Sequence, residues 1–471
     1  MSAPLWKAGE IAAAAGARVV GGPALDAAGI SIDTRTLSPG DLYVAIEGER
    51  HDGHDFVAAA FGAGASGALV SAIRAGGLAG GPLLVADDSL EGLRGLARAA
   101  RARSNARVVA VTGSVGKTSV KEMLRTALAP QGATHASAAS HNNHWGVPLT
   151  LARLPREARY AVLEMGMNHA REIAPLSALG RPRVAVITAI APVHIGNLGS
   201  LEAIADAKAE IFEGAERGAT AVIDADAPFA DKLAAAARAN GLSRTLTFGE
   251  AGADARLVSV EAHGDGSRVE ADVLGRRVAF ALGAPGGHMA KNALAVLLAV
   301  HALGADIDRA AAALAGFAAP GGRGARLRLS APGGEFTLID ESYNANPASM
   351  RAALALLGGT SPARGGRRVA IVGDMLELGA DAERLHAELA PALDAARVDL
   401  LLTAGPLSRA LHEAGRGGRE ARHADGAEGL AALALDALRG GDVAMAKGSN
   451  GSRVHAVVAA LKARASKSGG N

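Results

Sequence analysis

Apolar residues group into short runs along most of the chain, and longer alanine- and leucine-rich stretches separate these runs. Short apolar runs that alternate with helical patterns are typical of parallel α/β sheets. We therefore predict an α/β protein with mainly parallel sheets. The predicted strands are Arg107–Val111, Ala161–Glu164, Val184–Thr188, Ala219–Asp224, Thr337–Asp340, Arg368–Val372, Asp399–Thr403 and Val443–Lys447. The predicted helices are Thr118–Ala129, Leu201–Glu213, Gly287–Leu303, Ser349–Leu357, Ala382–Ala395 and Arg453–Ala465.

The segment from about Leu257 to Leu282 has a different pattern, in which charged and apolar residues alternate. We interpret it as an antiparallel excursion within the middle of the protein. Two glycine-rich breaks, Ala75–Pro82 and Ala318–Gly324, divide the chain. They predict an N-terminal domain over residues 1–86, a central domain over residues 87–320 and a C-terminal domain over residues 321–471.

The length of 471 residues agrees with about three domains. The 49 Lys and Arg residues nearly balance the 47 Asp and Glu residues, and no basic cluster stands out. A dedicated nucleic-acid-binding protein is therefore not expected. The chain has no cysteine, which excludes disulfides, thiolate metal ligands and cysteine nucleophiles and fits a reducing compartment.

Membrane insertion is not expected either. The longest apolar run, Ala293–Val300, is far shorter than the roughly 20 residues of a transmembrane helix. Near the start of the chain, Glu10 interrupts an alanine-rich stretch that only Lys7 precedes, which is not the pattern of a signal peptide. We expect a cytoplasmic protein.

The strongest chemical signal is the segment Val108–Ser119, where an apolar run leads into a glycine-rich turn and then a helical pattern. Backbone N–H groups of such a turn bind phosphates together with the helix N-terminus. Lys117 would contact the β- and γ-phosphates, and the Thr118 hydroxyl would bind Mg²⁺. Val111 occupies the position of the first glycine of the full P-loop motif. The predicted phosphate-binding residues are Thr112, Gly113, Ser114, Val115, Gly116, Lys117, Thr118 and Ser119.

This loop by itself does not distinguish a ligase from a kinase or a P-loop switch. A switch would need an Asp on a second strand for the Mg²⁺ site and a motif that selects its base. Nicotinamide binding is disfavoured, because no G-x-G-x-x-G lies between a strand and a helix.

Three further side chains follow the loop. Glu164 ends a predicted strand and could bind Mg²⁺ at the carboxyl edge of the sheet, although a turn or helix-cap carboxylate is the simpler alternative. His194 follows the next strand and would face the same crevice, but by itself it reads as an ordinary loop histidine. Lys208 lies in a helical pattern and by itself reads as a solvent-exposed lysine.

In this order, these features resemble the Mur ligases, the ATP-dependent amide-forming enzymes of peptidoglycan precursor assembly. The resemblance covers nearly the whole chain, and it is strongest to the branch that adds D-alanyl-D-alanine to UDP-N-acetylmuramoyl-tripeptide. The most discriminating segment, Ile339-Asp-Glu-Ser-Tyr-Asn-Ala-Asn-Pro347, is similar to the D-D-x-Y-N-A-N-P signature of that branch. The supporting segments are Thr112–Ser119, Asn142–Pro148, Glu164–Met167, Gly373–Gly379 and Asp33–Phe56.

The resemblance implies a mechanism through an acyl phosphate, with ATP and two Mg²⁺ ions. Lys117 and Thr118 would serve the ATP phosphates and Mg²⁺, while Glu164 and His194 would complete the metal shell. Lys208 matches the lysine that is carbamylated in this family, whose N-carboxylate helps to hold the second Mg²⁺. That modification requires a partly desolvated amine, because burial lowers a lysine pKa and frees the lone pair for CO₂. Lys117, Lys208 and His194 are thus the implied catalytic residues.

The other implied contacts are to the nucleotide and the substrates. Asn292 would lie near the adenine, Arg323 would reach the nucleotide, and Asp340 would hold the ribose or the domain hinge. Without the resemblance, the Asn-Ala-Asn-Pro segment would be interpreted as an ordinary turn that leads from a loop into a helix. The implied contacts to the uridine nucleotide and the peptides are Asp33, Thr34, Arg35, Asn142, Asn143, Tyr343, Asn344 and Asn346.

The chain departs from the family pattern at several positions. Glu341 replaces the usual second Asp, and Asn450 takes the fourth position of a K-G-S-R pattern. His141, His144 and Trp145 also differ from the commoner residues around the asparagine pair.

The domains implied by the resemblance are an N-terminal α/β domain that binds the UDP-sugar, a central P-loop ATPase and a C-terminal Rossmann-like domain that closes over ATP. We expect a monomer whose partners are UDP-N-acetylmuramoyl-tripeptide and D-alanyl-D-alanine, with no nucleic acid. The alternatives are a Mur-type ligase that adds a single amino acid, a folate-polyglutamate ligase and a non-catalytic P-loop nucleotide-binding protein.

Overall fold

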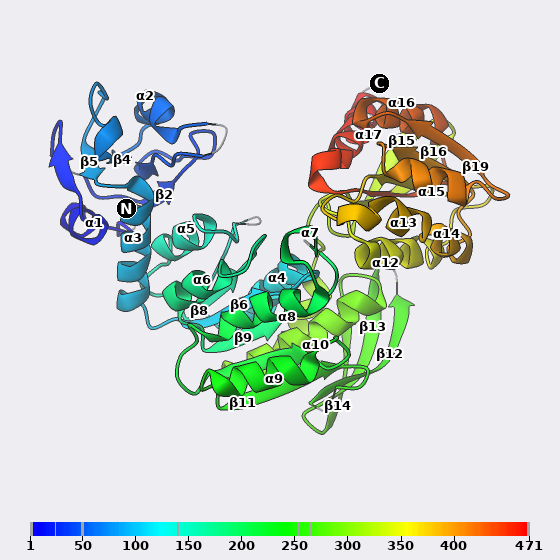
Figure 1. Ribbon diagram of the computed structural model, residues 1–471, viewed down its shortest axis with the longest axis horizontal. Coiled ribbons are helices and arrows are strands. Elements are labelled where there is room, and N and C mark those ends of the chain that lie inside the picture. The colour runs from blue at the N-terminus through cyan, green and yellow to red at the C-terminus, as the bar shows by residue number, and fades with distance from the viewer. Residues whose placement is uncertain are drawn as a thin grey trace.

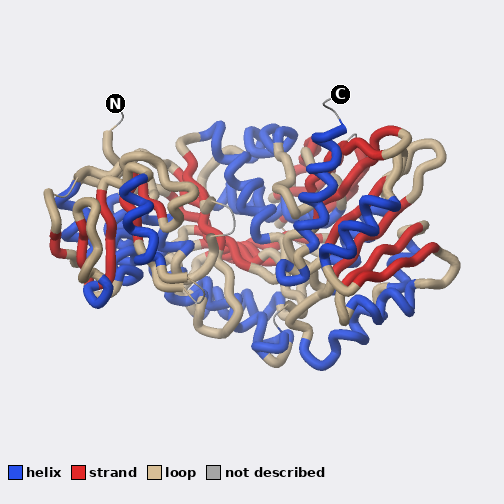
Figure 2. The backbone as a smooth tube through the Cα atoms, turned by 90° about the horizontal axis from the view of Figure 1, so that it is seen from above, coloured by secondary structure: helices blue, strands red, loops and turns tan. Residues whose placement is uncertain are grey.

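The strands of the protein form three separate sheets, as the computed structural model in Figure 1 shows. The structure describes residues 3–23, 25–48, 51–138, 141–193, 195–252, 254–263 and 265–468. Seen from above in Figure 2, the first and third sheets lie at opposite ends of the molecule with the second between them. Within the described ranges, no helix is both long and apolar enough to cross a membrane.

The N-terminal sheet has the order β1-β5-β4-β3-β2, and only its edge strand β1 is antiparallel to its neighbour. Its strands are β1 (Arg18–Val20), β2 (Gly29–Ser31), β3 (Asp41–Val44), β4 (Gly67–Ser71) and β5 (Leu83–Ala86). Its helices are α1 (Ala8–Ala15), α2 (Val57–Gly62) and the long α3 (Ser89–Arg103), which leads into the second sheet.

The middle sheet has the order β14-β13-β12-β11-β10-β9-β6-β8-β7. From β7 to β11 its pairings are parallel, and β12 to β14 form an antiparallel extension. Its strands are β6 (Arg107–Thr112), β7 (Thr134–Ala136), β8 (Tyr160–Glu164), β9 (Val184–Ile187), β10 (Thr220–Asp224), β11 (Arg244–Gly249), β12 (Ala255–His263), β13 (Gly266–Val273) and β14 (Arg276–Leu282). Its helices are α4 (Lys117–Leu128), α5 (Gly146–Ala152), α6 (Ile173–Gly180), α7 (Ile195–Leu198), α8 (Leu201–Ala209), α9 (Ala230–Ala239), α10 (Gly287–Ala302) and α11 (Ile307–Ala313).

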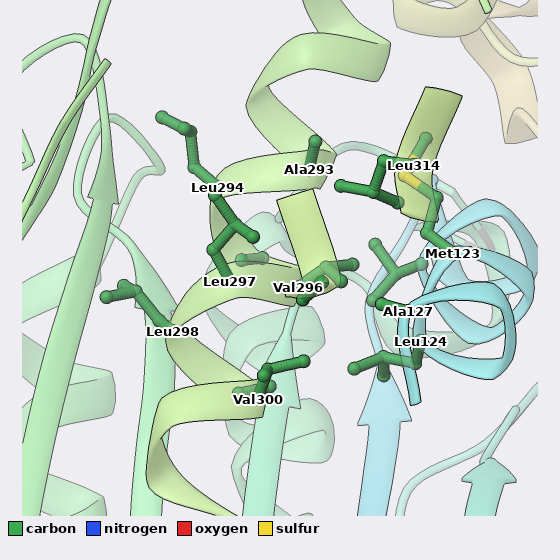
Figure 3. Close-up of a cluster of buried hydrophobic side chains, with 14 of the residues drawn as sticks. Met123, Leu124, Ala127, Ala293, Leu294, Val296, Leu297, Leu298, Val300 and Leu314 are labelled. Carbon is green, nitrogen blue, oxygen red and sulfur yellow. The ribbon is translucent and has the colours of Figure 1, made fainter. Parts of the chain in front are cut away.

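Helix α10 packs against the middle sheet and against α4. Its segment Ala293–Val300 is fully buried, and Figure 3 shows Val296 and Val300 of this helix facing Leu124 and Ala127 of α4. A helix that is apolar on all sides is stable only when protein surrounds it. The longest apolar run of the sequence is therefore a core helix, which fixes α4 and the loop before it.

The C-terminal sheet has the order β15-β16-β20-β17-β18-β19, and only β15 is antiparallel. Its strands are β15 (Ala325–Ala331), β16 (Gly334–Glu341), β17 (Arg368–Gly373), β18 (Leu400–Ala404), β19 (Glu420–Ala424) and β20 (Val443–Lys447). Its helices are α12 (Pro347–Gly358), α13 (Ala382–Ala387), α14 (Ala390–Ala395), α15 (Ser408–Gly415), α16 (Ala427–Ala437) and α17 (Val454–Ser468).

The predicted α/β class is confirmed, as are the eight predicted strands and the antiparallel excursion, which is β12 to β14. The prediction of one helix over Ala382–Ala395 is wrong, because α13 and α14 are separate helices. Pro391 lies in the first turn of α14. A proline lacks the N–H of a continuing helix and clashes with the preceding turn, so the chain restarts the helix there.

The N-terminal sheet is joined to the middle sheet by a shared apolar core. Trp6 and Ile11 from the N-terminal region share a buried cluster with Leu149 and Ala152 of α5. The Trp6 indole N–H donates to the Ala152 carbonyl at 2.8 Å, and the Arg103 guanidinium lies 3.6 Å from the centre of the Trp6 ring. Helix α3 contributes to this cluster as well, so it packs beyond the predicted domain limit at residue 86.

The junction between the middle and C-terminal sheets is different in kind. Among the described residues, each cluster of buried apolar side chains stays on one side of this junction. Two of the contacts that cross it are polar or involve the backbone: Arg326 reaches Asp265 at 3.5 Å, and Gly196 lies against the backbone at Glu377 and Gly379. The connecting segment contains Gly322 and Gly324, both at positive φ.

Candidate active site

A cavity of about 500 Å³ lies at the polar junction between the middle and C-terminal domains. The carboxyl ends of β6, β8, β9 and β10 and the first turn of α10 line one side of it. Residues around 322–323, 341–353 and 447 line the other side. Ligands of open α/β sheets bind at this edge of the strands.

The phosphate loop connects β6 to α4, as predicted. Gly113 and Gly116 have φ values of 146° and 87°, which favour glycine, and a Cβ on Gly113 would clash with the Thr188 hydroxyl. A Cβ on Gly116 would lie 3.0 Å from the Asn292 side-chain oxygen, so the missing side chain admits that amide. The loop thereby brings the predicted adenine residue Asn292 next to the phosphate-binding turn.

Lys117 lies over the loop and donates to the Gly113 carbonyl at 2.6 Å. Burial lowers the pKa of this lysine to about 8, and Arg323 contributes in the same direction while Glu164 opposes it. An anionic ligand would stabilise the ammonium form of this half-buried lysine. Its position and its pKa both fit a phosphate-binding role.

The side chains of Thr118 and Glu164 form a hydrogen-bonded pair next to the phosphate loop. The Thr118 hydroxyl donates to Glu164 Oε2 at 2.9 Å, and the Asn142 amide donates to Glu164 Oε1 at 2.8 Å. Glu164 is fully buried at the end of β8. Mg²⁺ is usually held by one or two carboxylates together with substrate phosphates, so a hydroxyl and a carboxylate at a phosphate loop fit this ion. No group of three or more His, Cys, Asp or Glu residues that could hold a metal by themselves is present in the described part of the chain.

Lys208 lies on α8 and is 2% exposed, so the interpretation as a solvent-exposed lysine is wrong. Burial holds the pKa of this amine well below its usual range, and the nearby Lys117 charge adds to the effect. A neutral buried amine is the form that can react with CO₂. His194, the other catalytic candidate, lies outside the described residues.

The C-terminal domain contributes an aromatic and cationic face to the cavity. The Arg323 guanidinium lies 3.9 Å from the centre of the Tyr343 ring, and both residues line the cavity with Asn344 and Asn346. The Asn346 side chain also accepts from the Ser349 N–H at 2.9 Å and caps α12, so the helix-start interpretation of this segment is confirmed. Asp340 is buried and accepts from the Ser342 hydroxyl at 2.6 Å, beside the cavity rather than on its wall.

Comparisons with known proteins identify this architecture. A family model described as "Mur ligase middle domain" matches residues 111–300, "Mur ligase, glutamate ligase domain" matches residues 325–450, and "Mur ligase family, catalytic domain" matches residues 26–86. The UDP-N-acetylmuramoyl-tripeptide--D-alanyl-D-alanine ligase of Escherichia coli is 38% identical over 83% of this chain and 84% of its own length. The chain belongs to the Mur ligase family.

Further Mur ligases agree with this assignment. The enzyme of the same description from Bacillus subtilis is 34% identical over 82% of this chain and 81% of its own length. The crystal structure of MurF from Acinetobacter baumannii superimposes with a TM-score of 0.82 at 28% identity, over 98% of this chain and all of that one. MurF from Thermotoga maritima in complex with ADP gives a TM-score of 0.74 at 25% identity, over 93% of this chain and 98% of that one.

Some of the residues expected from the Mur ligase resemblance lie away from the cavity. Asp33 and Arg35 form a 2.6 Å ion pair in the N-terminal domain, next to Thr34. The Asn143 side chain accepts from the Gly146 N–H at 2.9 Å at the start of α5. The structure therefore brings Asn142 to the cavity wall and gives Asn143 a local structural contact.

Two charged pairs also lie at the cavity, and neither pairing is predicted from the sequence. Lys447 at the end of β20 lies 3.3 Å from Glu341 at the end of β16, because the two strands are neighbours in the sheet. On the other side, the Lys291 ammonium is 2.7 Å from both Asp224 and Asp226. Two features of the sequence could have indicated the first pair: the K-G-S segment that begins at Lys447, and the replacement of the usual Asp by Glu341. Lys291 directly precedes Asn292, but nothing in the sequence linked it to Asp224.

Proposed function

We propose that the protein is an ATP-dependent ligase that adds D-alanyl-D-alanine to UDP-N-acetylmuramoyl-tripeptide. One observation carries the proposal: the phosphate loop, the Thr118–Glu164 pair and the predicted substrate residues Asn142, Tyr343 and Asn344 meet at one interdomain cavity. Relatives named for this reaction align over most of the chain, which supports the choice of substrates.

The reaction would proceed in two steps. The terminal carboxylate oxygen of the tripeptide attacks the γ-phosphorus of ATP, which forms an acyl phosphate and releases ADP. The amine of D-alanyl-D-alanine then attacks the acyl carbon, loses a proton and expels phosphate, leaving an amide. No protein nucleophile is needed, in agreement with a chain that has no cysteine.

In the first step, the chain would act mainly by positioning and electrostatics. The Lys117 ammonium would neutralise charge on the transferring phosphoryl group, and Arg323 would bind the nucleotide from the opposite wall. Thr118, Glu164, His194 and a carbamylated Lys208 would hold Mg²⁺, which supplies charge stabilisation at the phosphates. Asn292 and Asp340 would position the nucleoside.

The substrate contacts and the domain limits are part of the same proposal. Residues 1–86 would bind the UDP-sugar through Asp33, Thr34 and Arg35, and residues 87–320 would bind ATP. Residues 321–471 would close over the cavity and keep water from the acyl phosphate. We propose that the enzyme is a cytoplasmic monomer, in which one chain supplies the UDP-sugar-binding, ATP-binding and closing domains.

Product formation tests the function directly. The protein is incubated with ATP, Mg²⁺ and UDP-N-acetylmuramoyl-tripeptide, ending in either diaminopimelate or lysine, together with D-alanyl-D-alanine or one amino acid. We expect a new amide only with the dipeptide, and one phosphate released for each product. A product only with the single amino acid would show a different Mur ligase, and ATP binding without phosphate release would show a non-catalytic module.

A further inference from the structure

Lys121 is a buried cation for which the proposed reaction has no role. It lies on α4 four residues after Lys117, so both lysines project from the same side of the helix. Its side chain is 0% exposed, and it is among the largest fully buried side chains of the described residues. A charged group at such a site is retained only when neighbouring polar groups compensate it.

The partners of Lys121 connect it to the candidate metal ligand. Its ammonium donates to the Ser137 carbonyl at 2.9 Å and lies 2.9 Å from Glu122 Oε1 and 4.0 Å from Glu164 Oε2. Ser137 is buried, and its hydroxyl accepts from the Glu164 backbone N–H at 3.3 Å. Lys121 thus lies near the Glu164 carboxylate, and Ser137 binds the Glu164 backbone.

Glu164 is thereby under the influence of two cations. Its Oε2 accepts from Thr118 and faces Lys121, and its charge also acts on Lys117. Without Lys121, the buried carboxylate would have Lys117 as its main positive partner. It would then compete with the phosphates for Lys117 and turn away from Thr118.

We propose that Lys121 is a positioning residue that holds the Glu164 carboxylate toward Thr118 and away from Lys117. The inference rests on the nucleotide site of the proposed function. Lys121 does not touch the nucleotide; it sets the direction of a carboxylate that binds Mg²⁺ with the phosphates. Residues that orient metal ligands in this way typically change metal affinity or activity by about 10–100-fold when they are replaced.

The test compares ADP binding with and without Mg²⁺ by isothermal titration calorimetry. The quantity of interest is the Kd in EDTA divided by the Kd in Mg²⁺, which measures how much the metal strengthens binding. In Lys121→Met we expect this ratio to fall by about tenfold or more. Arg125→Met is the matched control, because Arg125 lies on the same helix with 54% of its side chain exposed, and the ratio should stay within about twofold of wild type.

A double-mutant cycle shows whether Lys121 acts through Glu164. In a Glu164→Gln background, Lys121→Met should change the ratio by less than about twofold, because the carboxylate that it positions has already lost its charge. Full additivity of the two substitutions would overturn the proposal.

Two results for the single variant would also overturn it. An equal loss of affinity with and without Mg²⁺ would make Lys121 a structural residue only, and a larger ratio would mean that its charge simply repels the metal. The product assay separates this inference from the proposed function. A wild-type protein that binds ADP more tightly with Mg²⁺ but forms no amide would refute the proposed function and leave the role of Lys121 intact.

Discussion

The two junctions of this protein join similar domains by opposite means. At the first junction, Trp6 and Leu149 share one apolar core, and the indole N–H finds its acceptor across the boundary. At the second junction, the buried cores of the described residues stop on either side, and a cavity of about 500 Å³ with charged residues on both walls lies between them. A shared apolar core resists relative motion, whereas a small polar interface permits it. We infer that the first two domains move as one body and that the third moves against them.

The difference assigns different tasks to the charged residues at each junction. Arg103 and Arg153 at the first junction donate to the backbone carbonyls of Leu5 and Ile30 and hold the N-terminal domain in place. Lys117 and Lys447 face the cavity at the second junction. Replacement of a first-junction residue should therefore change stability, and replacement of a cavity residue should change binding or turnover.

The largest effect is expected for Lys117→Ala. If Lys117 acts as proposed, loss of its ammonium should reduce ATP-dependent phosphate release by about a thousandfold, or about 4 kcal/mol of transition-state stabilisation. The urea midpoint of unfolding should not decrease, because desolvation of the half-buried ammonium disfavours its charged form. Turnover close to wild type would show that the cavity is not the site of phosphoryl transfer.

Trp6→Ala should have the converse effect at the first junction. Removal of a core tryptophan, with its hydrogen bond and its stacked guanidinium, should lower the free energy of unfolding by about 3–5 kcal/mol, measured by urea denaturation. The ADP affinity of the folded protein should change by less than about twofold. Ile73→Ala is the control, because this apolar residue of the same domain is 90% exposed and should change stability by less than about 0.5 kcal/mol.

Lys208→Ala should reduce turnover by about a hundredfold. A small carboxylic acid added to the assay should restore part of the activity, because it would replace the oxygens of the proposed Lys208 carbamate in the vacated space. Lys232→Ala provides the comparison, since Lys232 is exposed on α9 and pairs with Glu202 and Asp206. Full activity of Lys208→Ala would show that Lys208 is a buried lysine with no part in catalysis.

The two junctions should also differ in their response to pH: ADP binding at the second should depend on pH, and the stability of the first should not. The pKa of Lys117 is about 8, so above this pH the nucleotide-free protein carries a neutral amine there. Phosphates require the ammonium, so the ADP Kd should increase above pH 8 by at most about tenfold per pH unit and be independent of this group at lower pH. Calorimetry in buffers of different ionisation enthalpy would detect the proton uptake. The arginines of the first junction stay charged throughout this range, so no comparable change in its stability should follow.

The smallest effect is expected for Asp265→Asn at the edge of the second junction. Asp265 is 86% exposed and lies 3.5 Å from Arg326, and exposed ion pairs usually contribute less than about 1 kcal/mol. The ADP affinity and the urea midpoint should both be nearly unchanged. A large loss of either would show that this contact holds the C-terminal domain, contrary to the proposed mobility.

The sequence was most informative where structure depends on local patterns. The runs at Arg107–Val111 and Val443–Lys447 are strands because continuous apolar segments are buried in parallel sheets. The glycines of the phosphate loop were recognisable because their positive φ values are rarely accessible to other residues. Both signals lie within a few consecutive residues.

Features that depend on distant packing could not be derived from local patterns. Lys208 and Lys121 occupy helical positions that look exposed, and only the surrounding tertiary structure buries their amines. Lys447 and Glu341 are 106 positions apart and meet because β20 inserts next to β16. The resemblance to a family implies a role for Lys208, but it does not indicate Lys121.

The position of β20 also determines when the protein can finish folding during its synthesis. The N-terminal sheet has all its strands once Ala86 has been made, and the middle sheet once Leu282 has been made. The C-terminal sheet needs Val443–Lys447 at its centre, between β16 and β17, so it stays split until the last strand of the chain emerges. Translation that stops before Val443 would leave two open strand edges, which are prone to pair with other chains. A nascent chain of this protein therefore faces its greatest risk of aggregation near the end of synthesis.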